Sequence, residues 1–493
     1  LAAEFGTAGD GKWVWQDGGT VQIAGKSVRI ELKDLTGFDG RCDAIFFTTD
    51  PVAVLPEKPA DTVRRWRKKL LGLPETPPAA GAFDVVVVGG GVSGCSAAVA
   101  AARLGCKVAL VQDRPVFGGN TSPEIGVYGP RWGKPGPFIT GEIYAEKGKS
   151  RPSVAQRQGV LDAESNIKQF LGWHVFRATK DQQRIASVDA LNIYTNQELR
   201  FEAPVFIDCT GDGWVGFYAG AEYRYGQEGR DEYNESLAPE SPGRMVLGAT
   251  LHWKAAAGDE ATSFPEVPWA QAVSKDLAAT EGFWTWEYGH HRDMIQESEG
   301  IRDYLLRSIY GAFATAKQKD PEKMAKYGLH NVNYILGKRE SRRLVGDYVM
   351  TQMDCWDTPT KPDKIAVTSN PFDLHVPSEK YDFKIQVDER WSLNKRKDYE
   401  IPFRSLYSRN VTNLMMAGRC ISVTHVAHSS TRVMNTGSQT GVAVGAAAFL
   451  CKRYKADPRT VGREHIKELQ DIVFGRGNYA GALEKAAAGA PKR

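Results

Sequence analysis

The clearest pattern of apolar and polar positions begins at Phe83. The stretch FDVVVVGGGVSG is an apolar run that ends in glycines, and the small-residue segment AAVAAARLG and a second apolar run, KVALV, follow it. An unbroken apolar run of this length, bounded by glycine, is typical of a strand buried on both faces of a parallel sheet. The pattern therefore predicts a strand, a helix and a second parallel strand over residues 83–112.

Further elements follow along the chain. WHVFRAT, IASVDALNI and LRFEAPVFID alternate apolar and polar residues over 173–208, which predicts a small crossover sheet. Residues 226–401 are mixed, with aromatic-rich strands around Leu251 and Trp284 and a long helix from Glu297 to Lys319. After Ile401 the sequence again becomes rich in glycine, and a helix is predicted near Gly462 to Ile472.

The first 82 residues have a different pattern. VQIAG, SVRIEL and CDAIFFTTD are short β-rich runs separated by turn residues, so we expect three or four strands. They resemble the last strands of jelly-roll modules found beside carbohydrate-active enzymes, and either a sandwich remnant or a small docked sheet fits them. Of the two roles, a structural appendage without a ligand is the one we favour. The proline-rich stretch that follows carries one basic helix, DTVRRWRKKLLGL.

These patterns predict an α/β protein with a Rossmann-like nucleotide-binding domain. We expect that domain in two parts, 83–225 and 401–455, interrupted by a mixed β/α substrate or cap domain over 226–400. A β segment (1–50), a linker (51–82) and a C-terminal helical tail (456–493) complete the predicted organisation.

Composition narrows the class of protein. The 493 residues are 42% hydrophobic and 25% charged, with a net charge of +4, as in a soluble globular protein. No basic run is interleaved with aromatics, which argues against nucleic acid as a partner, and no apolar run reaches the roughly 18 residues of a membrane span. We expect a soluble protein; its localisation stays open, with export, periplasmic or secreted, slightly favoured over the cytoplasm. Seven scattered cysteines without a CxxC pair favour buried thiols over disulfides, and we expect no metal site.

The glycine loop carries the first functional signal. Gly89, Gly91 and Gly94 have the G-x-G-x-x-G spacing between a strand and a helix, where they permit a tight turn, approach of a pyrophosphate and close helix packing. The second strand usually ends in a carboxylate that binds the ribose hydroxyls. Gln112 stands there with Asp113 next to it, so we expect Gln112 first, and Asp113 second, to make that contact.

Three more glycine-bearing segments favour FAD over NAD. They are RPVFGGNTSPEIGV, VFIDCTGDGWVGF and the run from NLMMAGRCIS to NTGSQTGVAVG, which would enclose one long dinucleotide site. On these motifs the chain resembles the FAD-dependent oxidoreductases of the glutathione-reductase-like flavoprotein superfamily, in the subgroup with GGNTSPE, DCTGDG and AGRCIS, over about residues 83–450. The resemblance implies FAD as cofactor.

The resemblance, with the glycine loop, also implies the cofactor contacts. Asp212 is expected near the ribitol or as a helix N-cap, and free N–H groups of Gly437, Ser438, Gln439 and Thr440 are expected to face the flavin N1/C2 edge. The full set of expected cofactor contacts comprises Gly89, Gly91, Val92, Ser93, Gly94, Gln112, Asp113, Arg114, Gly118, Gly119, Asn120, Thr121, Ser122, Thr210, Gly211, Asp212, Gly418, Arg419, Gly437, Ser438, Gln439 and Thr440.

Four side chains are candidates for catalysis. His425 and His428 precede the last glycine-rich helix, where either would serve as a base for hydride chemistry, although packed or capping histidines fit as well. Arg432 would hold an anionic or hydroxyl-rich substrate or form an internal salt bridge. Glu124 would orient substrate, act as a base or stabilise its turn.

Candidate substrate contacts lie in the predicted cap domain. In FWTWEYG a strand would place Trp284 and Trp286 on one face with Glu287 adjacent, which is a platform for sugars or a piece of core. Arg339 belongs to a charged run, GKRESRRL, for which we expect buried Arg–Glu pairing or an arginine that faces the flavin.

We therefore expect an enzyme that oxidises a hydroxyl group of a carbohydrate-like substrate, with a small molecule or glycan as partner. A redox-neutral lyase or glycosidase, a C–C dehydrogenase or ene-reductase, and a non-catalytic FAD-containing glycan-binding protein stay open. The electron acceptor stays undetermined, and a homo-oligomer is compatible with the sequence.

Overall fold

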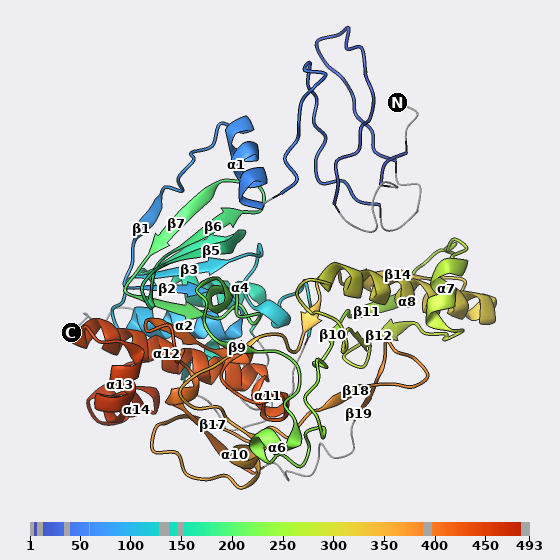
Figure 1. The fold of residues 1–493 in the computed structure, drawn as a ribbon. Helices are drawn as coiled ribbons and strands as arrows, with labels where there is room; N and C mark the ends of the chain where they lie inside the picture. The colour runs from blue at the N-terminus through green and yellow to red at the C-terminus, as the bar shows by residue number, and fades with distance from the viewer. Residues whose placement is uncertain are drawn as a thin grey trace. The chain divides into compact units, whose positions relative to one another are not determined.

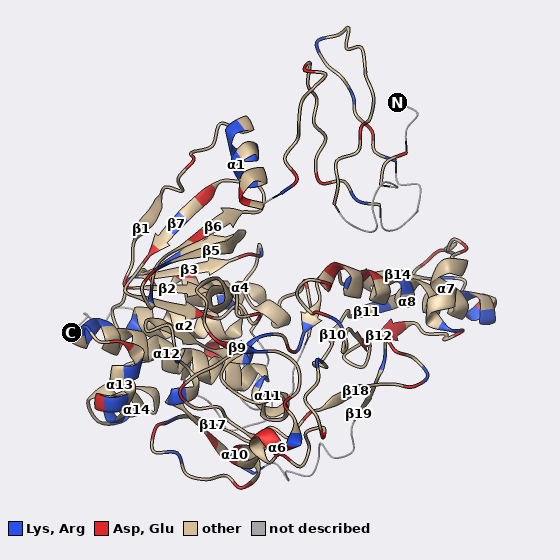
Figure 2. Cartoon of the chain, viewed as in Figure 1, with Lys and Arg blue, Asp and Glu red and all other residues tan. Residues whose placement is uncertain are grey.

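The computed structural model describes residues 4–6, 13–33, 40–58, 60–127, 138–144, 152–387 and 397–484. The chain divides into two compact units, Leu1–Pro77 and Pro78–Arg493 (Figure 1). The predicted helix of the first unit is present as α1, Ala60–Leu70, and its last turn is basic (Figure 2). Trp66 of α1 packs edge-on against Trp15 at a centroid distance of 6.0 Å.

The predicted N-terminal strands are not assigned. Among the described residues before α1, none belongs to a strand, and the alternating apolar side chains of that stretch, such as Ile23 and Ile30, are about half exposed. A strand needs a hydrogen-bonded neighbour, and no local pairing supplies one here. The β-module at residues 1–50 stays a prediction.

A five-stranded parallel sheet forms the centre of the second unit, in the order β21-β8-β2-β3-β4. Val85 pairs with Val108 on one side and with Val205 on the other, so β2 is the middle strand. The strands are β2 (Val85–Val88), β3 (Val108–Gln112), β4 (Ile167–Leu171), β8 (Val205–Asp208) and β21 (Leu414–Met416). This sheet confirms the Rossmann-type α/β fold and the predicted strand–helix–strand unit.

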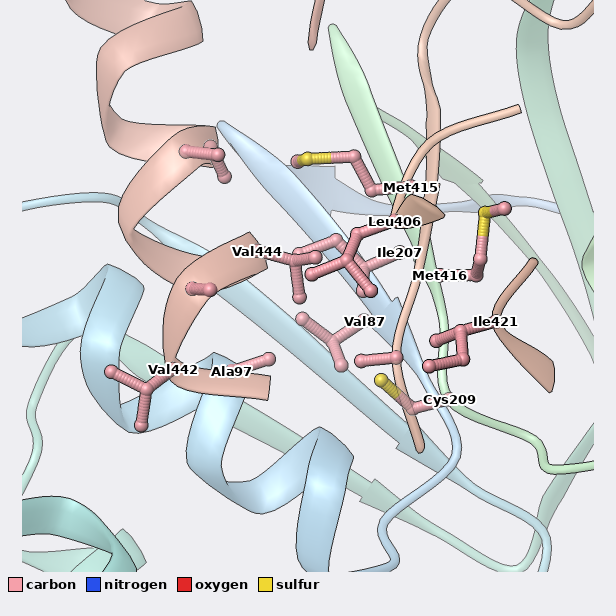
Figure 3. Packing of buried hydrophobic residues seen from close by; sticks show 14 of the residues in the cluster. Val87, Ala97, Ile207, Cys209, Leu406, Met415, Met416, Ile421, Val442 and Val444 are labelled. Atoms are coloured by element: carbon pink, nitrogen blue, oxygen red, sulfur yellow. The ribbon is translucent and has the colours of Figure 1, made fainter. Parts of the chain in front are cut away.

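Helices α2 (Val92–Arg103) and α12 (Met434–Tyr454) lie side by side on this sheet, although they are far apart in the sequence (Figure 1). Figure 3 shows the apolar cluster that joins them to the strands, with Val87, Ala97 and Val444 among its members. Their small residues let the two backbones approach closely, because a side chain added at Gly445 would lie 2.3 Å from the Ala97 carbonyl oxygen.

The predicted crossover sheet is also present, with the strand order β1-β7-β6-β5. Its members are β1 (Ala79–Ala82), β5 (Trp173–Asp181), β6 (Arg184–Asn192) and β7 (Glu198–Glu202). The position of β1 differs from the prediction. It lies inside the expected linker but pairs in parallel with β7, so the second unit already begins at Pro78.

Between β8 and β21, which are neighbours in the parallel sheet, the chain forms two three-stranded sheets, β13-β10-β15 and β12-β11-β14. The long helix predicted near Glu297 is α8, Ser298–Lys319, which packs on α7, Pro268–Ser274. The six strands are β10 (Ala249–Thr250), β11 (Trp253–Ala257), β12 (Glu281–Gly282), β13 (Glu287–Tyr288), β14 (Tyr327–Val332) and β15 (Gly337–Lys338).

Shorter elements complete the second unit. The strand pairs are β9 (Tyr223–Arg224) with β16 (Arg343–Leu344), β17 (Lys364–Thr368) with β20 (Tyr399–Pro402), and β18 (His375–Pro377) with β19 (Ile385–Val387). The remaining α-helices are α3 (Phe138–Ile143), α4 (Val154–Asp162), α5 (Trp214–Tyr218), α6 (Arg230–Tyr233), α9 (Pro321–Met324), α10 (Gln352–Trp356), α11 (His425–Thr431), α13 (Pro458–Glu464) and α14 (Ile466–Val473). Single 3-10 turns cover Gly119–Thr121, Phe403–Ser405, Gly418–Cys420 and Gly477–Tyr479. In the described part of the chain, no helix combines the length and apolar character that a membrane crossing requires.

Candidate functional site

The glycine loop between β2 and α2 has the backbone geometry that its sequence predicts. Gly89 has φ +101°, and a Cβ there would lie 2.3 Å from the Cys209 carbonyl oxygen. A Cβ at Gly94 would lie 1.7 Å from the Gly89 oxygen. At Gly91 the nearest atom would be the Gly119 Cα, 3.9 Å away. The first and third glycines are therefore fixed by packing, whereas Gly91 leaves open space.

Gln112 plays a different part from the one expected. Its side-chain oxygen accepts a hydrogen bond from the Gly90 N–H at 2.7 Å, and its amide nitrogen donates to the Val116 oxygen at 3.3 Å. Gln112 therefore holds the glycine loop with both ends of its amide. The Asp113 side chain is half exposed, and its carboxylate lies 3.8 Å from the His174 Nδ1.

The GGNTSPE loop lies directly beside the glycine loop. The Gly118 N–H donates to the Gly90 oxygen at 2.8 Å, and Gly118 and Gly119 both have positive φ. Thr121 is engaged within the chain, since its hydroxyl donates to the Gly118 oxygen and accepts from Arg157. The Ser122 hydroxyl is buried and has no hydrogen-bond partner.

Glu124 forms a turn-stabilising ion pair rather than standing free. Both of its oxygens accept from Arg114, at 2.7 and 3.3 Å. The pair is only partly buried. This contact favours the structural alternative for Glu124 and occupies Arg114 as well.

Asp212, in the T-G-D turn, is a buried carboxylate between two cations. It lies 2.9 Å from the Lys338 ammonium and 3.2 Å from the Arg419 guanidinium, and it accepts from the Ser341 hydroxyl at 2.7 Å. Burial raises the pKa of Asp212, but the two cations outweigh burial and lower it to about 2. The N-cap of α5 is Gly213, so the N-cap alternative for Asp212 is wrong, because the helix begins one residue later.

The turn at Gly418, which follows strand β21, packs against helices α2 and α12. A Cβ at Gly418 would lie 2.5 Å from the Ser93 hydroxyl, and the Gly418 N–H donates to the Thr440 hydroxyl at 3.1 Å. A Cβ at Gly211 would lie 2.5 Å from the Arg419 Nε. The three distant glycine-bearing segments therefore converge.

The expected free N–H groups at residues 437–440 are wrong by one turn. Helix α12 begins at Met434, and the Gly437 N–H already bonds the Val433 oxygen. The Ser438 hydroxyl bonds Ser96 and Thr140. The Gln439 amide nitrogen is buried without a hydrogen-bond partner. The sequence prediction began the helix at the glycines, but the polar residues before them are helical too.

The charged run from Lys338 to Arg343 connects these segments. Asn120 donates to the Lys338 oxygen at 3.0 Å. The run also contains the predicted buried Arg–Glu pairing, since Arg343 lies 3.3 Å from Glu340 and 3.1 Å from Glu228. This short stretch thus touches the GGNTSPE loop, the T-G-D turn and, through the residues described next, helix α11.

The two candidate histidines share α11 but differ in chemistry. His425 Nδ1 lies 2.9 Å from the Glu340 carboxylate, so it donates, and its Nε2 is buried without a hydrogen-bond partner. His428 Nε2 donates to the Arg339 carbonyl oxygen at 3.0 Å. Burial lowers the pKa of His428 to about 3, and the nearby Glu340 opposes this only in part. Burial raises the pKa of Glu340, but His425 and Arg343 outweigh burial and lower it to about 2.

The expected tryptophan strand is wrong. Trp284 and Thr285 form a turn. Trp284 is 47% exposed, whereas Trp286 is buried against Trp253 and Phe383. Glu287 is fully buried and accepts from the Gly248 N–H at 2.6 Å. Local alternation predicted one shared face, but the turn separates the two rings.

Comparison with known proteins decides the family. Residues 84–146 and 152–473 match the family described as FAD dependent oxidoreductase. The chain belongs to this family.

Solved structures similar to this chain include three with 12% or 13% sequence identity. OxyS anhydrotetracycline hydroxylase from Streptomyces rimosus is 12% identical, with 80% of this chain and 67% of that chain covered and a TM-score of 0.35. A geranylgeranyl bacteriochlorophyll reductase-like protein from Thermoplasma acidophilum is 12% identical (82% and 92% covered, TM-score 0.32). The myxobacterial chondrochloren halogenase CndH is 13% identical (82% and 82% covered, TM-score 0.32). Similarities this low assign neither a substrate nor a reaction to this chain.

This FAD-dependent oxidoreductase has a site whose residues fit the cofactor. Gly91 leaves room beside the N-terminus of α2, which no described side chain caps, and free N–H groups at a helix N-terminus bind phosphate. Three buried polar atoms around the site have no hydrogen-bond partner: Ser122 Oγ, Arg419 Nη1 and Gln439 Nε2. Buried polar groups are normally paired, so a polar ligand there would complete the structure.

Sequence reasoning missed several residues of this flavoenzyme. Lys338 and Ser341 hold Asp212 from a segment more than a hundred residues away, and a charged run between apolar residues was the only signal for them. Asp373 and His375 contact the predicted residues Arg432 and Glu287. The surrounding sequence NPFDLHV has no spacing that would have predicted those contacts.

Proposed function

We propose that this FAD-dependent oxidoreductase is of the glutathione-reductase-like kind and oxidises a hydroxyl-bearing carbon of a polar, carbohydrate-like substrate. His425 is the base. The observation that supports this role is the His425–Glu340 pair, in which the carboxylate fixes one ring nitrogen and leaves Nε2 buried and unpartnered. When bound, FAD supplies the two-electron acceptor for a hydride.

The Glu340 carboxylate does two things for His425. It selects the tautomer in which Nδ1 carries the proton, so Nε2 presents a lone pair to the substrate hydroxyl. It also stabilises the imidazolium that forms when Nε2 takes the hydroxyl proton, as a carboxylate does beside a catalytic histidine. The low pKa of Glu340 keeps the carboxylate ionised throughout.

His428 is a weaker candidate for the base. Its Nε2–H donates to the Arg339 carbonyl oxygen, and its Nδ1 is buried without a partner. Among the described residues no carboxylate bonds its ring directly, and a pKa of about 3 makes its imidazolium costly at neutral pH. We assign it a positioning role on the segment that carries Glu340. The redox-neutral and C–C alternatives would not require the proton transfer assigned to His425.

Within the cofactor site, we propose that Asp113 rather than Gln112 binds the ribose. The N-terminus of α2, with Val92 and Ser93, would hold the pyrophosphate, and Asp212 would accept from ribitol hydroxyls. The segment from Gly118 to Ser122 would lie beside the ring.

Anaerobic mixing with a panel of sugars tests the function. We expect loss of the flavin absorbance band with at least one sugar, and we expect His425→Gln to slow that bleaching by about 10²–10⁴-fold at unchanged FAD content. Glu340→Gln should change the pH profile of bleaching. His330→Gln, at an exposed position of β14, is the matched control and should behave as wild type. Equal bleaching rates in His425→Gln and wild type would refute the assigned base, and no bleaching by any sugar would refute the substrate class.

A further inference from the structure

A second charged cluster lies next to the two histidines. We call it the Glu287 network, and it consists of Glu287, Arg339, Asp373, His375 and Arg432. His375 stands at its centre, with Nδ1 2.6 Å from Glu287 and Nε2 3.0 Å from Asp373. Asp373 also accepts from Arg432 Nη2 at 2.6 Å, and Arg339 Nη1 lies 3.1 Å from Glu287.

The carboxylates of the Glu287 network are already satisfied. Each oxygen of Asp373 has one partner within the network. One oxygen of Glu287 accepts from the Gly248 N–H and lies 3.2 Å from His290, and the other faces His375 and Arg339. Every carboxylate oxygen of the network therefore has at least one partner within the protein.

One donor of the network, by contrast, has no partner among the described residues. The Nε of Arg432 is buried without a hydrogen-bond partner, and the Arg432 side chain is only 12% exposed. Burial lowers the pKa of His375, but Glu287 and Asp373 outweigh burial and raise it above its ordinary value. A buried donor without a partner favours a ligand that accepts a hydrogen bond, and an ionised acceptor forms the stronger bond with a guanidinium.

The network borders on solvent at Trp284. That indole is 47% exposed, and its ring centroid lies 5.9 Å from that of His375. The Asp373 side chain is 32% exposed on the same network. An exposed indole beside polar groups suits the face of a sugar ring.

Arg339 connects Trp284 to the segment that holds the proposed base, His425. Its Nη2 donates to the Trp284 carbonyl oxygen at 2.8 Å, and its own carbonyl oxygen accepts from His428. The next residue along the chain is Glu340, which holds His425. A molecule stacked on Trp284 would therefore lie close to the acid–base pair.

We propose that Trp284 and Arg432 form a substrate subsite for a carboxylate-bearing sugar, with Trp284 stacking on the pyranose ring and Arg432 binding the carboxylate. Asp373 is a positioning residue that orients Arg432, and His375, which is held by Glu287, fixes Asp373 in turn. This inference rests on the proposed function and narrows its substrate class to acidic sugars.

Binding measurements on the FAD-loaded enzyme test the subsite separately from turnover. The probes are methyl glycosides of glucuronate and galacturonate with their neutral parents, glucose and galactose, and dissociation constants are read by calorimetry and tryptophan fluorescence. We expect at least one uronate to bind about tenfold or more tightly than its neutral parent, as a hydrogen bond to a charged group provides.

Variants separate the charge from the fold. Arg432→Gln should remove the preference for the uronate and leave the neutral sugar's dissociation constant within about twofold, and Arg432→Lys should restore part of the preference. Arg404→Gln breaks another Arg–Asp pair, with Asp363, and should change neither constant. Melting temperature and FAD content show whether Arg432→Gln has a folding defect. If it does, the uronate preference of Arg432→Lys tests the role of the charge instead.

Equal affinity for uronate and neutral partner in both pairs, or no measurable binding of any probe, would overturn the proposal. An equal loss for both sugars in Arg432→Lys would overturn it too. Bleaching of the flavin by neutral sugars together with equal affinities would refute the acidic-sugar subsite while leaving the proposed function intact. Tight uronate binding without any bleaching of the flavin would support the subsite but refute the proposed oxidation.

Discussion

Replacement of Gly441 by alanine tests the contact that holds the cofactor loop. Gly441 lies in α12, and an added Cβ would stand 2.2 Å from the Ser93 carbonyl oxygen, where ordinary contact begins at 3.4 Å. Helices α2 and α12 would have to separate by the difference, about 1.2 Å. The Ser93 oxygen cannot rotate away, because it belongs to the backbone.

The size of the effect follows from a matched comparison. Gly300 lies in α8, and a Cβ there would meet nothing within 4 Å. Both Gly→Ala changes gain helix propensity of up to about 1 kcal/mol, which cancels in the comparison. The remaining difference is the cost of overpacking, and we expect Gly441→Ala to be less stable than Gly300→Ala by about 1–3 kcal/mol.

Urea unfolding of the FAD-loaded variants, followed by circular dichroism and flavin fluorescence, measures this difference. Because Ser93 lies in the first turn of α2, a displaced helix should also weaken FAD binding in Gly441→Ala but not in Gly300→Ala. Equal unfolding midpoints and equal FAD affinities for the two variants would refute the packing argument.

Three further changes have definite expected outcomes. Asp212→Asn should lower FAD affinity at neutral pH because Lys338 and Arg419 lose their carboxylate; in wild type the stability from Asp212 is present above about pH 4 and is lost as the pH falls towards 2, which acid titration of wild type and variant measures. His428 has a folded pKa of about 3 against 6.5 for the free side chain, so protonation favours unfolding and stability falls by up to about 1.4 kcal/mol per pH unit below about 6.5; His428→Gln should flatten the acid side of a pH–stability profile, and an unchanged profile would contradict the buried neutral state. Ser122→Ala should leave the FAD-free protein as stable as wild type, because the hydroxyl has no partner, but should weaken FAD binding about 3- to 10-fold; equal dissociation constants by fluorescence titration would exclude Ser122 as a contact.

The sequence by itself determined the nucleotide-binding core. The Val85–Val88 run and the spacing of Gly89, Gly91 and Gly94 predicted a buried parallel strand, its turn and its helix, because burial on both faces and a tight turn each require particular residue types within a few positions. The later glycine motifs predicted FAD for the same local reason. Those features depend on neighbours in sequence, so they can be read without a structure.

Only the tertiary structure decided how the polar side chains are used. Gln112 turned inward to the glycine loop, Trp284 and Trp286 separated at a turn, and His425 rather than His428 received a carboxylate from a distant segment. The physical reason is that hydrogen bonds and ion pairs join whichever groups folding brings within about 3 Å, whatever their separation along the chain. The backbone of the nucleotide-binding core follows from local residue types, whereas the charge, tautomer and accessibility of a side chain follow from its neighbours in space.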